Sequence, residues 1–120
     1  MKMKGLVLVV DDDESIRESL CDILVDEGYD ALGAANGREA LSLIRRNGRP
    51  CVILLDLMMP VMDGATFRRE QLRNPSLRDI PVAVITAAGP QAAAGIRAHA
   101  VLLKPLRVEG VLDVVERYCP

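Results

Sequence analysis

The sequence predicts an α/β protein in which a parallel sheet carries helices on both faces, an arrangement known as a doubly wound fold. Four short segments are apolar at every position instead of at alternate positions, which is typical of strands buried on both faces. These segments are Leu6–Val10, Val52–Leu55, Val82–Ile85 and Val101–Leu103. Helical patterns separate them, so strands and helices alternate along the chain, as a parallel sheet requires.

The first helix is predicted directly after the first strand. Its apolar residues recur at the spacing of one helical face: Ile16, Leu20, Ile23 and Leu24. Ser15 or Asp13 can cap its start, and Gly28 stands where a left-handed residue commonly follows a helix. A weaker extended segment around Tyr29–Ala34 is interpreted as a fifth strand.

Three further helices are predicted by the same criteria: one from Asn36-Gly37 to about Asn47-Gly48, one from about Ala65 to Leu72, and one from Val108 to about Tyr118. The segment between Ala87 and Ala100 is the least regular, because it is rich in alanine and contains Gly89 and Pro90. A short helix around residues 91–98 can form there, although Ile96 is its only large apolar residue.

Length and composition favour one domain over residues 1–120, with no segment left for an output domain. The chain of 120 residues is half hydrophobic and has a net charge of −2, which is ordinary for a globular protein. Its basic residues form no patch of the kind that binds nucleic acid. No apolar run approaches the roughly 20 residues that span a bilayer, so we expect neither a membrane segment nor a signal peptide.

The histidine and cysteine content narrows the possible chemistry. Only one histidine is present, so a histidine-based metal site or catalytic triad is nearly excluded. The cysteines are odd in number and widely spaced, without a C-x-x-C pattern: Cys21, Cys51 and Cys119. We interpret them as reduced thiols and expect a cytoplasmic protein.

Polar residues of distinct chemistry follow four of the predicted strands. Asp11 and Asp12 come after the first strand, Asp56 after the third, Thr86 after the fourth and Lys104 after the fifth. The carboxyl ends of the strands meet at one edge of a doubly wound sheet, where such proteins bind their ligands. If the first and third strands are neighbours, their ends lie about 5 Å apart.

The acidic residues at this edge predict a divalent cation. Carboxylates so close repel one another and share protons unless a cation lies between them. Mg²⁺, or Mn²⁺ in its place, suits Asp12 and Asp56 as ligands, with Asp11 acting through a water. The backbone carbonyl of Met58 can supply another oxygen. Because an aspartate can attack phosphorus and form an aspartyl-phosphate, Asp56 is also a candidate nucleophile, with Lys104 neutralising oxygen charge.

Several segments in order add a more specific signal: Leu6 to Asp12 (LVLVVDD), Leu54 to Gly64 (LLDLMMPVMDG), Pro81 to Ala87 (PVAVITA) and Lys104-Pro105. Together they resemble the response regulator receiver (CheY-like) family of two-component signalling, and the resemblance covers essentially the whole chain. It implies a flavodoxin-like (βα)5 fold with the strand order 2-1-3-4-5.

The resemblance also implies a role for each polar residue at the predicted edge. Asp56 is the phosphoacceptor, Asp11 and Asp12 are the acidic pair at the metal, Met58 is a carbonyl ligand, Thr86 is the switch hydroxyl, and Lys104 contacts the phosphate. A cis peptide bond before Pro105 is a further expectation of the family.

The resemblance implies partners as well. Receivers take the phosphoryl group from a phosphohistidine on a histidine kinase or histidine phosphotransfer protein. They then signal to a downstream protein partner or a fused domain through a two-state change of their surface. We therefore expect a signalling module that assists its own phosphorylation and dephosphorylation, and not an enzyme in the ordinary sense.

Two features depart from the family pattern. Residues 87–103, between Thr86 and Lys104, are several fewer than usual, so we expect a fourth helix that is shortened, displaced or mobile. Val101 stands where an aromatic residue is usual, so the coupling of Thr86 to an aromatic rotamer cannot operate in its normal form. We expect intact phosphorylation chemistry with an altered readout.

Two other functions remain open from the sequence. The altered fourth-helix region is compatible with a pseudo-receiver, which would bind proteins without being phosphorylated. A phosphohydrolase working through an aspartyl-phosphate is disfavoured, because Met58 stands where a second acid–base carboxylate would be expected and no substrate-binding cap is evident.

Overall fold

The computed structural model describes residues 4–59, 62–94 and 96–119 and confirms the predicted doubly wound fold. Five parallel strands form one sheet in the order β2-β1-β3-β4-β5. The strands are β1 (Leu6–Val10), β2 (Asp30–Ala34), β3 (Val52–Asp56), β4 (Val82–Thr86) and β5 (Ala100–Leu103). The helices are α1 (Glu14–Asp26), α2 (Gly37–Asn47), α3 (Gly64–Arg73) and α4 (Val108–Tyr118), with a 3-10 helix, η1, over Pro90–Ala93.

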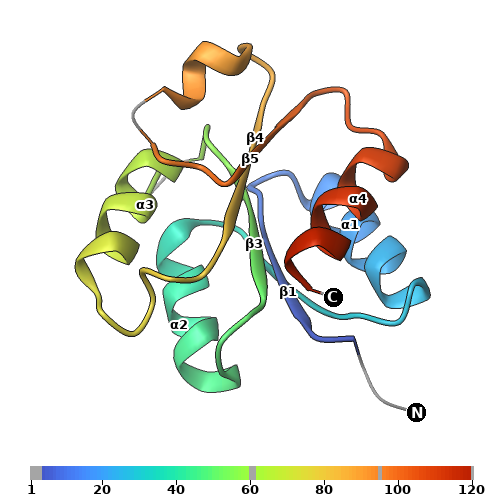
Figure 1. Cartoon of the computed structure of the whole chain (residues 1–120), viewed down its shortest axis with the longest axis horizontal. Helices are drawn as coiled ribbons and strands as arrows, with labels where there is room; N and C mark the ends of the chain where they lie inside the picture. The colour runs from blue at the N-terminus through green and yellow to red at the C-terminus, as the bar shows by residue number, and fades with distance from the viewer. Residues whose placement is uncertain (1–3, 60–61, 95, 120) are drawn as a thin grey trace.

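The helices cover the two faces of the sheet in pairs (Figure 1). α1 and α4 lie on one face, and α2 and α3 lie on the other. Alternate strand residues enter the two apolar clusters: Leu8 and Val10 pack on the α2–α3 side, whereas Val7 and Val9 pack on the α1–α4 side. Because both faces are buried, the central strands are apolar except for the polar residues that end β3 and β4. Among the described residues, no helix is both long enough and apolar enough to cross a bilayer.

Local signals in the sequence set the ends of the helices. Asp13, and not Ser15, caps α1, since its carboxylate accepts a hydrogen bond from the backbone of the first turn. Asn36 and Asp63 cap α2 and α3 in the same way. Gly28 follows α1 with a φ of +96°, in the left-handed region that favours glycine.

The connection between β4 and β5 is short, as expected, and in its described part only the four residues of η1 are helical. The prediction that the last strand is buried on both faces was wrong, because Val101 is 39% exposed and Leu103 is 47% exposed. Ala100 and Leu102 pack into the α1–α4 cluster. The side chains of Val101 and Leu103, which alternate with these two residues along the strand, are among the exposed large apolar side chains.

A buried arginine from α3 holds the same connection in place. Arg68 is only 4% exposed. Its guanidinium donates hydrogen bonds to the backbone carbonyls of Ile96 (3.1 Å) and Arg97 (2.7 Å) and to the side-chain oxygen of Gln71 (2.7 Å). A buried charge requires such partners to offset its desolvation. Arg68 therefore ties the backbone before β5 to α3.

The structure corrects the prediction for two of the cysteines. Cys51, just before β3, and Cys119, at the end of α4, form a disulfide, and their Cα atoms are 5.5 Å apart. Cys21 on α1 is free, as expected. The prediction was wrong because the two residues are 68 positions apart in the chain, and a sequence without a fold gives no measure of their distance in space.

Candidate functional site

Three carboxylates meet at the carboxyl edge of the sheet. Asp11 follows β1 and Asp56 ends β3, and these strands are neighbours with Val10 paired to Leu55. One ligand oxygen from each of Asp11, Asp12 and Asp56 can be chosen so that all three lie within 4.8 Å of one another. Asp11 and Asp56 are buried and Asp12 is exposed, so the cluster opens to solvent on one side. The prediction that these residues converge is confirmed.

Local hydrogen bonds fix the position of Asp11. Its Oδ1 accepts a hydrogen bond from the backbone N–H of Asp13 at 2.9 Å. Its backbone carbonyl accepts one from the guanidinium of Arg17 at 2.9 Å. Sequence reasoning missed Arg17. Its position one turn into α1 could have indicated it, because helical side chains point back toward the N-terminus, where Asp11 lies. The remaining carboxylate oxygen, Oδ2, is buried and has no hydrogen-bond partner among the residues that the structure describes.

Asp56 is held by the loop that follows it. The backbone N–H of Met58 donates to Oδ1 of Asp56 at 3.2 Å. The loop then returns close to its own start, where Gly64 N–H donates to the carbonyl of Leu57 at 3.1 Å. A Cβ atom at Gly64 would lie 2.9 Å from the Asp56 carbonyl oxygen and 2.8 Å from the Leu57 Cα. The glycine is therefore required by this close approach of backbone.

Lys104 reaches the same carboxylate from the other side. Its Nζ lies 3.7 Å from Oδ2 of Asp56. The backbone N–H of Lys104 donates to the carbonyl of Thr86 at 2.9 Å, which fixes the end of β5 against β4. The bond between Lys104 and Pro105 is cis, as the resemblance implied.

The environment of Asp56 raises its pKa to about 6 from an ordinary value of 3.8. Burial is the largest cause, because it disfavours the charged form. The negative charges of Asp11 and Asp12 act in the same direction, whereas the Met58 N–H and the Lys104 ammonium act in the opposite direction. A cation near Asp56 would therefore favour its ionised form.

Thr86 is the last residue of β4, and β4 is the neighbour of β3, which ends at Asp56. Thr86 is only 2% exposed, and its hydroxyl oxygen accepts a hydrogen bond from the backbone N–H of Ala88 at 3.0 Å. Asp56 is paired in register with Ile85, the residue before Thr86. The four predicted strand tips thus share one edge, although the Thr86 hydroxyl engages its own loop and not the carboxylate.

The donor set fits a hard divalent cation. Three carboxylates in one cluster are the oxygen ligands that Mg²⁺ and Mn²⁺ prefer. The buried, unpartnered Oδ2 of Asp11 is an acceptor that a cation or one of its waters would satisfy.

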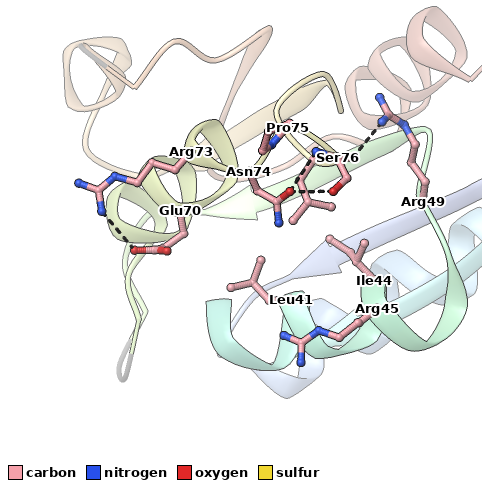
Figure 2. Close-up of a pocket in the computed structure, with 10 residues that line it drawn as sticks. Leu41, Ile44, Arg45, Arg49, Glu70, Arg73, Asn74, Pro75 and Ser76 are labelled. Atoms are coloured by element: carbon pink, nitrogen blue, oxygen red, sulfur yellow. Dashed lines mark hydrogen bonds and ion pairs between the residues drawn. The ribbon is translucent and has the colours of Figure 1, made fainter.

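A separate cavity of about 730 Å³ lies between α2 and the end of α3 (Figure 2). Leu41 and Ile44 project into it from α2. Two of its arginines already have partners: Arg49 donates to the carbonyl of Ser76, and Arg73 lies 3.9 Å from Glu70. The helix ends that line it lie at the opposite edge of the sheet from Asp56, so this cavity is not part of the acidic site.

Comparison with known proteins agrees with this geometry. The family model for the response regulator receiver domain matches residues 7–116. The chain is 44% identical over 110 residues to the response regulator MprA of Mycolicibacterium vanbaalenii. This match covers 88% of this chain and 46% of that protein. The chain is 32% identical to sporulation initiation phosphotransferase F of Bacillus subtilis, which covers 98% of this chain and 96% of that protein.

Solved structures give the same result. The chemotaxis response regulator CheY4 of Vibrio cholerae superposes with a TM-score of 0.86 at 32% identity, covering 98% of this chain and 99% of that one. The chain spans about half the length of MprA. The activity of the whole MprA protein is therefore not assigned to this chain. Fold, acidic cluster and relatives agree, and the chain belongs to the response regulator receiver family, as a phosphoacceptor domain of two-component signalling.

Proposed function

We propose that Asp56 accepts the phosphoryl group and that a phosphohistidine on a histidine kinase or phosphotransfer protein donates it. The observation that carries the proposal is the position of the Asp56 carboxylate, between two other carboxylates and the Lys104 ammonium. Oδ1 is bound by the Met58 N–H, and Oδ2 faces Lys104. We assign the attack on phosphorus to Oδ2, because Oδ2 faces the Lys104 ammonium whereas the Met58 N–H occupies Oδ1.

The neighbouring residues have separate tasks in this proposal. Asp11, Asp12 and Asp56, with the backbone carbonyl of Met58, would hold Mg²⁺ or Mn²⁺. When bound, the ion would neutralise the carboxylates and the phosphoryl oxygens. Lys104 would balance charge on the opposite side of the phosphoryl group. Thr86 would have to leave the Ala88 N–H to reach a phosphoryl oxygen, so a change at the tip of β4 would accompany phosphorylation.

The proposal also covers the setting of the domain. Residues 1–120 would act as one receiver domain in the cytoplasm, where histidine kinases present their phosphohistidine. The signal would pass to a downstream protein or to a fused domain. An apolar groove of about 410 Å³ lies between α1 and residues 104–111. A side chain of the donor protein would dock in this groove, beside Lys104.

A pseudo-receiver is the weaker reading of this site. Such a protein needs neither a clustered set of acids nor a lysine beside the acceptor, yet both are present here. The departures from the family lie in the β4–β5 connection and at Val101 on β5, and not at Asp56. They affect how a signal would be read, and they do not remove the groups that would accept it.

The test is phosphorylation by a small acyl phosphate in the presence of Mg²⁺, followed by intact-protein mass spectrometry. We expect a mass increase of one phosphoryl group in the wild type and none in Asp56→Asn. Asp79→Asn, an exposed aspartate before β4, is the matched control and should be phosphorylated normally. Equal labelling of Asp56→Asn, or no labelling of the wild type, would contradict the proposal.

A further inference from the structure

The disulfide joins two parts of the chain that contribute nothing to the phosphorylation site. Cys51 lies directly before β3, at the end opposite to Asp56, and Cys119 lies directly after the last turn of α4. Their Cα separation of 5.5 Å is the one most often found for disulfides. Cys119 is 3% exposed and packs with Val111, Val114 and Val115 of α4 in the cluster between helix and sheet.

The fold does not need this bond to form a core. Domains that depend on disulfides are generally too small to bury enough apolar surface. This chain buries apolar clusters on both faces of its sheet, and the disulfide touches only one of them. A bond that is unnecessary for folding, in a family whose proposed setting is the cytoplasm, suggests a redox role.

We propose that Cys51 and Cys119 are a reversible dithiol–disulfide site whose oxidation clamps the C-terminal end of α4 to β3. The clamp would act beside a second attachment, in which the Tyr118 hydroxyl donates to the carbonyl of His99 at 3.0 Å. Both attachments lie in the last turn of α4 or just after it, so loss of the covalent one would leave this end held by packing and one hydrogen bond. The covalent loop that it closes contains Asp56, Thr86 and Lys104.

The chemistry is thiol–disulfide exchange with a low-molecular-weight disulfide. The thiolate of Cys51, which is more exposed than Cys119, attacks one sulfur of that disulfide and expels a thiolate, giving a mixed disulfide. The Cys119 thiolate then attacks the Cys51 sulfur and expels the second thiolate. Two electrons pass from the cysteines to the small disulfide, and the two cysteine protons end on the two released thiols. Two small thiols reverse the reaction.

The third cysteine provides an internal control. Cys21 lies on α1 and is free. Burial, with the nearby negative charge of Asp22, raises the pKa of its thiol, which reduces the thiolate available for exchange. Cys21 therefore differs from the proposed pair in having no partner cysteine at bonding distance.

The first experiment equilibrates the full chain in buffers with varied ratios of reduced to oxidised glutathione and traps free thiols with a maleimide polymer. We expect the Cys51–Cys119 pair to change from dithiol to disulfide as the ratio of reduced to oxidised glutathione falls. The thiol of Cys21 should react with the maleimide polymer in every buffer. A pair that stays oxidised in the most reducing glutathione buffer would be a fixed cross-link. A pair that stays reduced in the most oxidising buffer would not be a redox site. Either result overturns the proposal.

The second experiment measures amide hydrogen exchange of residues 108–118 in both redox states. We expect exchange in this helix to be faster in the reduced chain, on the order of tenfold or more, because the closed loop no longer restricts opening. Cys51→Ser and, separately, Cys119→Ser should match the reduced wild type in both buffers, and Cys21→Ser should match the wild type. Equal exchange in oxidised and reduced wild type would overturn the clamp.

Discussion

The strand tips around Asp56 and the connection between β4 and β5 are built in opposite ways. At the tips, each polar residue continues a strand whose register is fixed by hydrogen-bonded neighbours, so the sheet itself sets the geometry. The described part of residues 87–99 has only the short η1 and is positioned by contacts from elsewhere, among them those of Arg68. The comparison indicates that the sheet holds the strand tips in place, whereas a few side chains hold this connection in place.

The largest expected effect is at the strand tips, on Lys104. Lys104→Gln removes the ammonium that lies 3.7 Å from Oδ2 of Asp56 and leaves the strand ends in place. We expect phosphorylation by a small acyl phosphate to slow by about 10²- to 10³-fold, the usual cost of removing one preorganised charge donor. The matched control is Arg107→Gln, an exposed cation three residues further along the chain, which should react normally. An unchanged rate in Lys104→Gln would show that Lys104 does not stabilise the transferred group.

The second prediction concerns the β4–β5 connection. Arg68→Met leaves the carbonyls of Ile96 and Arg97 without their donor, and we expect a loss of about 2–3 kcal/mol in the free energy of unfolding. Denaturant unfolding measures this loss. Arg69→Met, at an exposed neighbour on the same helix, should change stability by less than about 0.5 kcal/mol. If amide exchange of the segment before β5 is no faster in Arg68→Met than in the wild type, Arg68 is not its anchor.

The third prediction concerns the effect of the raised pKa of Asp56 on the free energy of unfolding. Because the pKa is about 6 in the folded chain and 3.8 when unperturbed, the folded state keeps a proton that the unfolded state releases between these values. Protonated Asp56 therefore stabilises the folded state. This stabilisation is fully present below pH 4 and is lost as the pH rises through 6. Without a metal, ionised Asp56 therefore destabilises the fold at neutral pH.

The measurement is urea unfolding in a chelator. Asp56→Asn should be more stable than the wild type by about 3 kcal/mol at pH 7.5, and this difference should shrink towards zero at pH 4. The exposed Asp79→Asn should show no such pH dependence relative to the wild type. A constant difference across the pH range would mean that the Asp56 proton is not the cause.

The fourth prediction is that Mg²⁺ stabilises the fold by binding the acidic cluster. At tenfold excess over the dissociation constant, we expect about 1.4 kcal/mol of stabilisation, detected as a rise in melting temperature. Asp12→Asn removes a charged ligand that is exposed and does not support the core, so it should weaken the shift without unfolding the chain. A melting temperature unmoved by millimolar Mg²⁺ in the wild type would count against the metal site.

The same contrast explains which features were predictable from the sequence. Asp11, Asp56 and Lys104 could be placed together because each follows an apolar segment, and parallel strands end at one edge. The Cys51–Cys119 disulfide and the Arg68 anchor could not, since both depend on residues far apart in the chain that meet only after packing. Val101 was misread because an apolar strand pattern does not reveal whether a helix covers the second face.

The smallest expected effect tests that last point with a matched pair of valines. Val84 and Val101 are paired in register on β4 and β5, yet Val84 is fully buried and Val101 is 39% exposed. Val84→Thr buries a hydroxyl in the core and should cost about 1–3 kcal/mol, whereas Val101→Thr should cost less than about 0.5 kcal/mol. Denaturant unfolding of both variants gives the comparison. If Val101→Thr cost as much as Val84→Thr, the side chain of Val101 would be buried in solution, contrary to its exposure in this structure.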